Sequence, residues 1–228
     1  SIVTVATTSI LESINPATGE VVGSVPVASM SEITEVVARA RAAQPQWNAL
    51  GLAARVEILR PVAERLAEEA ERIGNLITSE MGKSHKEAQG EASYGAEQFT
   101  LELDDAAAAL EPEEITDENT SSMLYWDPLG VSAAITPWNF PMLMPQQCIL
   151  PSLVAGNTVV FKPSEETPLV GQAYADILNE VLPDDVLQVV HGADDQGKAL
   201  VSSDINLVAF VGSRAVGAKI LAACSPDL

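Results

Sequence analysis

Two short segments carry the side chains best suited to chemistry. In the first, Ile135–Pro141 (ITPWNFP), an apolar run enters a turn bracketed by prolines that presents one amide, Asn139. In the second, another apolar run ends on Lys162, Ser164 and Glu165. An amide N–H can stabilise a developing oxyanion, and a lysine near a glutamate can offer a donor and an acceptor to adjacent ribose hydroxyls. Polar groups at the carboxyl ends of neighbouring strands define the crevice where open α/β sheets bind ligands.

A third segment, Gly212-Ser213, lies between an apolar run and a helical pattern. Small side chains and free N–H groups at a helix N-terminus suit a diphosphate. The three segments should meet because parallel strands place their carboxyl ends at one edge of a sheet. Together they predict a nucleotide site, although the sequence contains no Gly-x-Gly-x-x-Gly fingerprint. Taken singly, each segment has an ordinary structural alternative: a solvated ion pair for Lys162 and Glu165, a turn former for the amide, and a common helix start.

Strand and helix patterns alternate from residue 131 onward. Short continuous apolar runs predict strands at 131–135, 158–161, 186–190 and 207–211, separated and followed by helices at about 142–154, 168–181, 194–202 and 213–222. This alternation predicts βαβ units and a parallel sheet covered on both faces. The expected fold class is therefore α/β, a doubly wound, Rossmann-like parallel sheet.

Long helices precede this sheet. Their predicted ranges are about 29–43, 52–82 and 84–110, and a strand is predicted at 121–126. Ser29 and Glu32 have the spacing of a capping box at the start of the first helix. Pro61 should kink or divide the second helix, and Gly82 occupies a position typical of a helix C-cap.

The charge balance limits the classes of partner. The chain has 32 acidic residues against 12 basic ones, a formal net charge of −20. Such a surface repels nucleic acids and anionic membranes, so we expect neither as a partner. A solvated acidic face is the simplest interpretation. A more specific interpretation is adaptation to high salt, because screening by salt removes the self-repulsion of the acidic surface.

Cysteine and histidine usage points to an ordinary reducing environment. Cys148 and Cys224 give no disulfide framework, which is typical of the cytoplasm. His85 and His191 lack metal-ligand spacing, so we expect surface or hydrogen-bonded core histidines and no metal site.

The sequence shows no sign of a membrane span or of secretion. No apolar run is long enough to cross a bilayer, and the first residues lack the basic segment of a secretory signal. We therefore expect a cytoplasmic globular protein.

Seven segments, taken in order, resemble the NAD(P)-dependent aldehyde dehydrogenase family. They are Ile14–Glu20 (INPATGE), Met81–Lys83 (MGK), Pro128–Val131 (PLGV), Pro137–Pro141 (PWNFP), Ala155–Thr158 (AGNT), Lys162–Glu165 (KPSE) and Phe210–Ser213 (FVGS). Within the family, the opening is similar to the succinate-semialdehyde type. The resemblance implies an incomplete aldehyde dehydrogenase fold in three parts. These are residues 1–112, the N-terminal helical part of a cofactor-binding domain; 113–130, a bridging or oligomerisation strand segment; and 131–228, the Rossmann-like NAD-binding core, with the catalytic domain missing.

The resemblance also implies a role for each matching residue. Asn139 would donate its side-chain N–H to the oxyanion of a tetrahedral thiohemiacetal, a contribution of roughly 3–4 kcal/mol. The cofactor-binding residues would be Ile135, Thr136, Pro137 and Trp138 on the nicotinamide side, Lys162, Ser164 and Glu165 at the adenosine ribose, and Gly212, Ser213 and Val216 at the diphosphate and adenine. Glu165 would favour NAD by repelling a 2′-phosphate, while Lys162 and Ser164 could still admit NADP. The substrate would be a small-molecule aldehyde, and the full-length protein would be a homo-oligomer.

The chain departs from the family pattern in several places. Cys148 stands where many members have a lysine, which puts any proton relay through that lysine in doubt. Val211 replaces the usual threonine of the Phe-Thr-Gly-Ser motif. Neither the Leu-Glu-Leu-Gly-Gly motif of the general base nor the Gly-Gln-x-Cys context of the nucleophile occurs in the 228 residues. Cys224 follows its helix instead of opening it, so we expect a buried free thiol there.

Two hypotheses remain open at this point. The chain is the N-terminal cofactor-binding part of an aldehyde dehydrogenase, or it is a noncatalytic nucleotide-binding or interaction fragment that lacks the cysteine nucleophile. In both cases we expect the 228 residues alone to be inactive as a dehydrogenase. A truncated sheet would also leave the strand at 121–126 without a partner, and such an edge promotes association.

Overall fold

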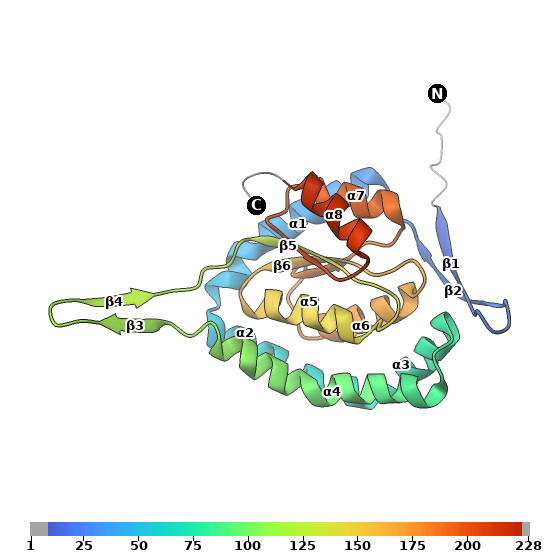
Figure 1. The fold of residues 1–228 in the computed structure, drawn as a ribbon, viewed down its shortest axis with the longest axis horizontal. Coiled ribbons are helices and arrows are strands. Elements are labelled where there is room, and N and C mark those ends of the chain that lie inside the picture. The colour runs from blue at the N-terminus through green and yellow to red at the C-terminus, as the bar shows by residue number, and fades with distance from the viewer. Residues whose placement is uncertain (1–8, 225–228) are drawn as a thin grey trace, which may run out of the picture.

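The computed structural model describes residues 9–224 (Figure 1). Its N-terminal group of elements comprises β1 (Ile10–Ile14), β2 (Val21–Pro26), α1 (Met30–Ala49), α2 (Leu52–Leu59), α3 (Val62–Met81) and α4 (His85–Ala108). A hairpin of β3 (Glu113–Thr116) and β4 (Ser121–Leu124) follows. The C-terminal group comprises β5 (Val131–Ile135), α5 (Leu143–Val154), β6 (Thr158–Lys162), α6 (Pro168–Asn179), β7 (Leu187–Val189), α7 (Asp194–Val201), β8 (Leu207–Phe210) and α8 (Arg214–Ala223).

The C-terminal strands form one parallel sheet in the order β7-β6-β5-β8. Ile135 at the end of β5 pairs with Lys162 of β6 and with Phe210 of β8, so the carboxyl ends of these three strands lie side by side. The central strands β5 and β6 are buried along almost their whole length, which explains their continuous apolar runs. The predicted doubly wound α/β class and its alternation of strands and helices are confirmed.

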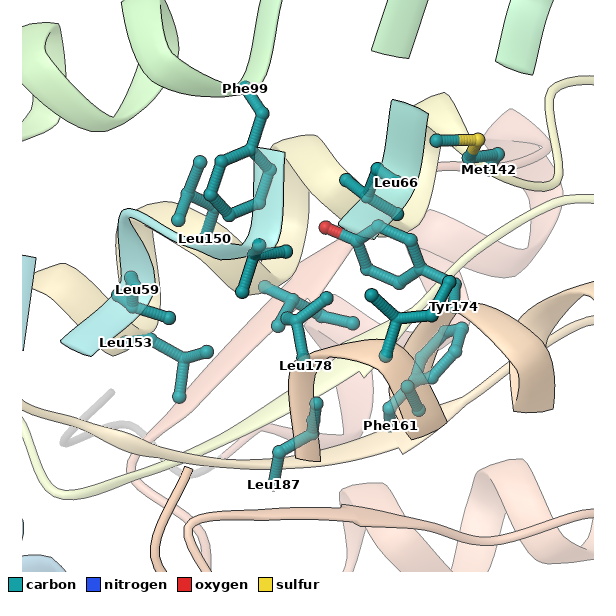
Figure 2. Packing of buried hydrophobic residues seen from close by; sticks show 14 of the residues in the cluster. Leu59, Leu66, Phe99, Met142, Leu150, Leu153, Phe161, Tyr174, Leu178 and Leu187 are labelled. Atoms are coloured by element: carbon teal, nitrogen blue, oxygen red, sulfur yellow. The ribbon is translucent and has the colours of Figure 1, made fainter. Parts of the chain in front are cut away.

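Helices cover both faces of this sheet (Figure 1). On one face, α5 and α6 pack on the strands and α2, α3 and α4 form a layer behind them. Figure 2 shows this larger core, in which Phe99 of α4, Leu150 of α5 and Tyr174 of α6 are fully buried. On the other face, α1 and α7 cover a smaller core that includes Ile33 and Val160. Burial of each such side chain contributes roughly 1.5–3 kcal/mol, so both layers hold the sheet in place.

The predicted boundaries of the N-terminal helices are mostly confirmed. The Ser29 hydroxyl accepts the Glu32 N–H at 3.2 Å, and the Glu32 carboxylate accepts the Ser29 N–H at 2.7 Å, which completes the capping box. The predicted second helix is divided before Pro61 into α2 and α3. Gly82 ends α3 with φ at 75°, a left-handed conformation that favours glycine. Within residues 9–224, no helix combines the length and the apolarity needed to cross a bilayer.

Helix α1 is longer than predicted. It continues past residue 43 to Ala49 although Pro45, which lacks a backbone donor, lies inside it. Contacts with α5 and with the turn that follows it compensate for that loss. Trp47 is 1% exposed and donates its Nε1–H to the carbonyl of Leu153 at 3.0 Å, and Gln44 donates to the carbonyl of Gly156 at 3.0 Å. Tertiary packing therefore extends the helix beyond the local sequence pattern.

The strand predicted over 121–126 is present, but the expectation that it lacks a partner is wrong. The strand β4 ends at Leu124 and pairs antiparallel with β3, placing Leu124 opposite Glu113. Asp117 forms the connecting turn, where its Oδ1 accepts the N–H groups of Asn119 and Thr120 at 2.8 Å each. Glu113 and Glu114, which follow α4 by a few residues, thus belong to the pairing partner of β4. The hairpin extends away from the body of the molecule (Figure 1), and every residue of its two strands is exposed.

Candidate functional site

A cavity of 340 Å³ opens at the carboxyl edge of the parallel sheet. The ends of β5, β6 and β8 line it together with α7 and α8. All ten residues that the sequence predicts to bind a cofactor are among the lining residues: Ile135, Thr136, Pro137, Trp138, Lys162, Ser164, Glu165, Gly212, Ser213 and Val216. The parallel register brings them together from three separate turns. The volume falls in the usual range of ligand pockets, roughly 300–1,000 Å³.

Lys162 is the buried cation of this cavity. It ends β6 and is 5% exposed, and its Nζ lies 3.7 Å from Oε2 of Glu165. Desolvation lowers the pKa of Lys162, and the Glu165 carboxylate opposes that shift. The alternative of a solvated ion pair is wrong for the lysine, whose side chain is only 6% exposed, whereas the glutamate side chain is 40% exposed. The pair can bind a vicinal diol because the ammonium donates to one hydroxyl and the carboxylate accepts from the other.

The start of α8 forms another part of the lining. Ser213 is the N-cap, and its Oγ accepts the N–H of Val216 at 3.2 Å. Gly212 packs tightly against Phe210, because a Cβ at this glycine would come within 2.6 Å of the ring. The remaining free N–H groups of the first turn and the helix dipole favour a negatively charged ligand at this end.

Two further lysines border the cavity. Lys198 of α7 and Lys219 of α8 join Lys162 in its lining, so three of the five lysines in the chain surround one site. In a protein with a net charge of −20, this gathers positive charge where an anionic ligand would bind. Sequence reasoning missed Lys198 and Lys219, and also Asp194 of α7. The one available signal was helical spacing, since Asp194 and Lys198 are four residues apart and share a helix face.

Asn139 lies outside the cavity lining. It is exposed on the loop between β5 and α5, directly after Trp138, which does line the cavity. The backbone carbonyl of Asn139 accepts a hydrogen bond from Lys83 Nζ at 2.7 Å. The structure therefore groups the ten predicted cofactor-binding residues and places the predicted oxyanion donor on the adjacent loop.

His191 follows β7 and is only 6% exposed. Its Nε2 lies 2.7 Å from Oε1 of Gln172. Burial, and then the positive charge of Lys162, lower the pKa of His191 to about 4, so the imidazole is neutral near pH 7. The expectation of a hydrogen-bonded core histidine holds for one ring nitrogen, whereas Nδ1 has no hydrogen-bond partner within residues 9–224. In the same part of the chain, no three His, Cys, Asp or Glu side chains gather as a metal site.

Comparison with known proteins decides the family. The sequence model described as "Aldehyde dehydrogenase family" matches residues 3–228. This chain belongs to the aldehyde dehydrogenase family. It is 39% identical over 210 residues to malonate-semialdehyde dehydrogenase 2 of Bacillus mycoides, covering 90% of this chain and 43% of that protein. It is 38% identical over 220 residues to the mitochondrial succinate-semialdehyde dehydrogenase of Arabidopsis thaliana, covering 94% and 41%.

Solved aldehyde dehydrogenase structures share the fold. An NADP-dependent glyceraldehyde-3-phosphate dehydrogenase from Bacillus halodurans, complexed with NADP, superposes with a TM-score of 0.90 at 32% identity, covering 96% of this chain and 48% of that one. Lactaldehyde dehydrogenase from Escherichia coli superposes with a TM-score of 0.89 at 31% identity, covering 97% and 47%. The chain therefore spans less than half the length of these relatives and carries an incomplete aldehyde dehydrogenase fold.

Neither described cysteine has the setting of an aldehyde dehydrogenase nucleophile. Cys148 is 7% exposed, and burial raises the pKa of its thiol to about 11, so the reactive thiolate is scarce at neutral pH. The prediction that Cys224 is a buried thiol is wrong. It is half-buried at the C-cap of α8, a helix that buries none of its residues, and it lines an apolar groove beside β8.

Proposed function

We propose that this chain forms the N-terminal, cofactor-binding part of an enzyme that oxidises an aldehyde to a carboxylate with NAD(P). One observation carries the proposal: the ten residues to which the family resemblance gives a cofactor role come from the ends of β5, β6 and β8 and the start of α8, and all of them line a single cavity. Membership of the aldehyde dehydrogenase family supports the same reaction class. The two relatives described above are both semialdehyde dehydrogenases, which favours a small-molecule semialdehyde as the substrate.

The residues present fit a nicotinamide dinucleotide. Lys162 and Glu165 would bind the adenosine ribose hydroxyls, and the N-terminal turn of α8 would bind the diphosphate. The lysines around the cavity would balance the charge of that diphosphate. When bound, the nicotinamide supplies the acceptor for the hydride that leaves the substrate. Binding of NADP by the Bacillus halodurans protein supports the same class of cofactor here.

Asn139 would supply the oxyanion donor of the reaction. Its exposed position beside Trp138 leaves the side-chain amide accessible to a substrate at the mouth of the cavity. A single preorganised donor of this kind accelerates acyl chemistry by roughly 10²–10³-fold. Asn139→Ala should therefore lower kcat by about that factor and leave the cofactor Kd unchanged.

The cofactor assignment is tested by the choice between NAD and NADP. Glu165→Gln removes a carboxylate next to the ribose site, so we expect about a tenfold gain in NADP affinity relative to NAD. Titration calorimetry with each nucleotide measures the ratio. Glu166→Gln is the matched control, because it makes the same charge change one residue further on, at an exposed position outside the cavity lining. An equal effect of both variants would contradict the assignment.

The catalytic assignment is tested on the native full-length protein. We expect aldehyde-dependent formation of NADH or NADPH with a panel of semialdehydes. Nucleotide binding without oxidation of any aldehyde in the panel would favour the alternative, a noncatalytic nucleotide-binding or interaction module. Absence of nucleotide binding would contradict both assignments.

We also propose that the protein is cytoplasmic, adapted to high salt and assembled as a homo-oligomer. The two cysteines are free, as a reducing compartment predicts. The net charge of −20 supports the adaptation to salt.

The β3–β4 hairpin supports assembly into a homo-oligomer. It extends from the body of the molecule (Figure 1), and its apolar side chains Ile115 and Leu124 are exposed.

A further inference from the structure

A buried charge cluster lies beneath the loop that presents Asn139. It consists of Lys83, at the junction of α3 and α4, and Glu91 of α4, neither of which lines the cofactor cavity. The Lys83 Nζ lies 2.5 Å from Oε2 of Glu91, and the two side chains are only 12% and 2% exposed. The same ammonium donates to the backbone carbonyl of Asn139 at 2.7 Å and lies 4.0 Å from the centroid of the Phe140 ring.

The second oxygen of Glu91 binds the far end of the same loop. Its Oε1 accepts the N–H of Met142 at 3.1 Å and that of Leu143 at 3.4 Å, where α5 begins. A carboxylate at a helix N-terminus is favoured by the helix dipole, and hydrogen bonds to an ionised group are stronger than neutral ones. One ion pair therefore fixes the loop at two points, the carbonyl of Asn139 and the start of α5.

The contacts of Lys83 set the orientation of the peptide that follows Asn139. Fixing that carbonyl restricts the rotation of the backbone from which the amide side chain projects. Without the lysine, Glu91 would be left as a buried charge with no cationic partner, and it would be free to reorganise its bonds to α5. We propose that Lys83 and Glu91 are positioning residues that orient Asn139 for oxyanion stabilisation. The inference rests on the proposed role of Asn139 and extends it to residues that do not touch the substrate.

Three variants of the full-length protein test this inference. Lys83→Met keeps the length of the side chain and removes its charge and donors. Misplacement of a catalytic group by about 1 Å costs on the order of 100-fold, so we expect a fall in kcat of that size with an unchanged Kd for the cofactor. Lys83→Arg restores a cation and donors and should return kcat to within about threefold of the parent. Arg72→Met, which removes the cation of the exposed Arg72–Glu69 pair on α3, is the matched control and should not change kcat.

A double-mutant cycle separates positioning from a general structural role. If Lys83 acts through Asn139, the variant Lys83→Met/Asn139→Ala should be no slower than Asn139→Ala alone, because the group to be positioned is already absent. The inference would be overturned if kcat of the double variant fell by the product of the two single-variant losses. Failure of the proposed function would give a different result. In that case the single variant Asn139→Ala would keep the parental kcat.

Hydrogen exchange gives a readout that does not depend on activity. Loss of the anchor should raise amide exchange in the peptide covering residues 136–143 by at least about tenfold in Lys83→Met, with little change in α7 or α8. Unchanged exchange in this peptide would overturn the inference whatever the enzyme does. Restored protection in Lys83→Arg would support it, since the arginine provides the same charge and donors.

Discussion

At the scale of single residues, burial and a neighbouring charge together shift the pKa values of Lys162 and His191. Lys162 is desolvated but has the Glu165 carboxylate 3.7 Å away, which favours its charged form. His191 is desolvated and also feels the positive charge of Lys162, and Asp176 offsets only part of that effect. The lysine can therefore serve as a cationic ligand-binding group, whereas the histidine is held neutral within the core.

The neutral state of His191 predicts a loss of stability in acid. Its pKa in the folded protein, about 4, lies below the value of 6.5 for an exposed histidine. The folded state therefore binds fewer protons than the unfolded state between these values, so stability falls as the pH falls through this window. A shift of this size corresponds to roughly 3 kcal/mol by pH 4. Urea unfolding of the parent and of His191→Gln should show a shallower pH dependence for the variant.

The control for this prediction is His85→Gln, which removes an exposed histidine from the start of α4. Its stability should follow the parent curve between about pH 7 and pH 4. Parallel curves for the parent and His191→Gln would show that the buried imidazole does not resist protonation.

At the scale of elements, two glycines near the start of α4 have opposite roles. Gly82 ends α3 with φ at 75°, where a side chain is strained. Gly90 lies inside α4, and a Cβ there would meet nothing within 4 Å. Gly82→Ala should destabilise the protein by about 1 kcal/mol because of the left-handed backbone. Gly90→Ala should stabilise it by roughly 0.8–1 kcal/mol through helix propensity.

Thermal unfolding of the two glycine variants checks this pair. Each variant is the matched control of the other, because both add one methyl group within the same region of the chain. A decrease in Tm for Gly82→Ala together with an increase for Gly90→Ala is expected. Equal shifts of the same sign would mean that the left-handed C-cap does not restrain the end of α3.

At the scale of the whole molecule, the β3–β4 hairpin carries the proposed assembly. Ile115 and Leu124 share one face of the hairpin, because Ile115 is two residues from Glu113, which pairs with Leu124. Ile115→Glu places a charge on this apolar face and should reduce the molar mass measured by light scattering. Thr116→Glu adds the same charge to the opposite face and serves as the control. A parental protein that is monomeric at all concentrations would contradict the proposal.

The net charge predicts a response of the whole molecule to salt. With a charge of −20, self-repulsion should weaken the compact state at low ionic strength, and added KCl should raise Tm as the charges are screened. The Debye length falls from about 10 Å at 0.1 M to about 3 Å at 1 M, so much of the gain from screening should appear in this range. Differential scanning calorimetry over this range is the measurement. A Tm that is indifferent to KCl would contradict adaptation to high salt.

Local and topological signals in the sequence determined most of the fold and most of the cavity. Apolar periodicity, the Ser29 capping box and Gly82 located the helices, because these signals depend on residues within one or two turns of each other. Three turns, at residues 136–138, 162–165 and 212–213, were expected to meet because the carboxyl ends of parallel strands lie at one edge of the sheet. The cofactor roles of the ten cavity residues, and the inclusion of Ile135 and Val216, came from the family resemblance.

Only the tertiary structure decided the features that depend on distant contacts. The extension of α1 to Ala49 rests on Trp47 bonding to Leu153, and the anchoring of the Asn139 loop rests on Glu91 bonding to Met142. Lys198 and Lys219 line the cavity because of the way α7 and α8 pack at its edge. No local pattern encodes such contacts, because the partners are brought together only when the helices pack on the sheet and on one another.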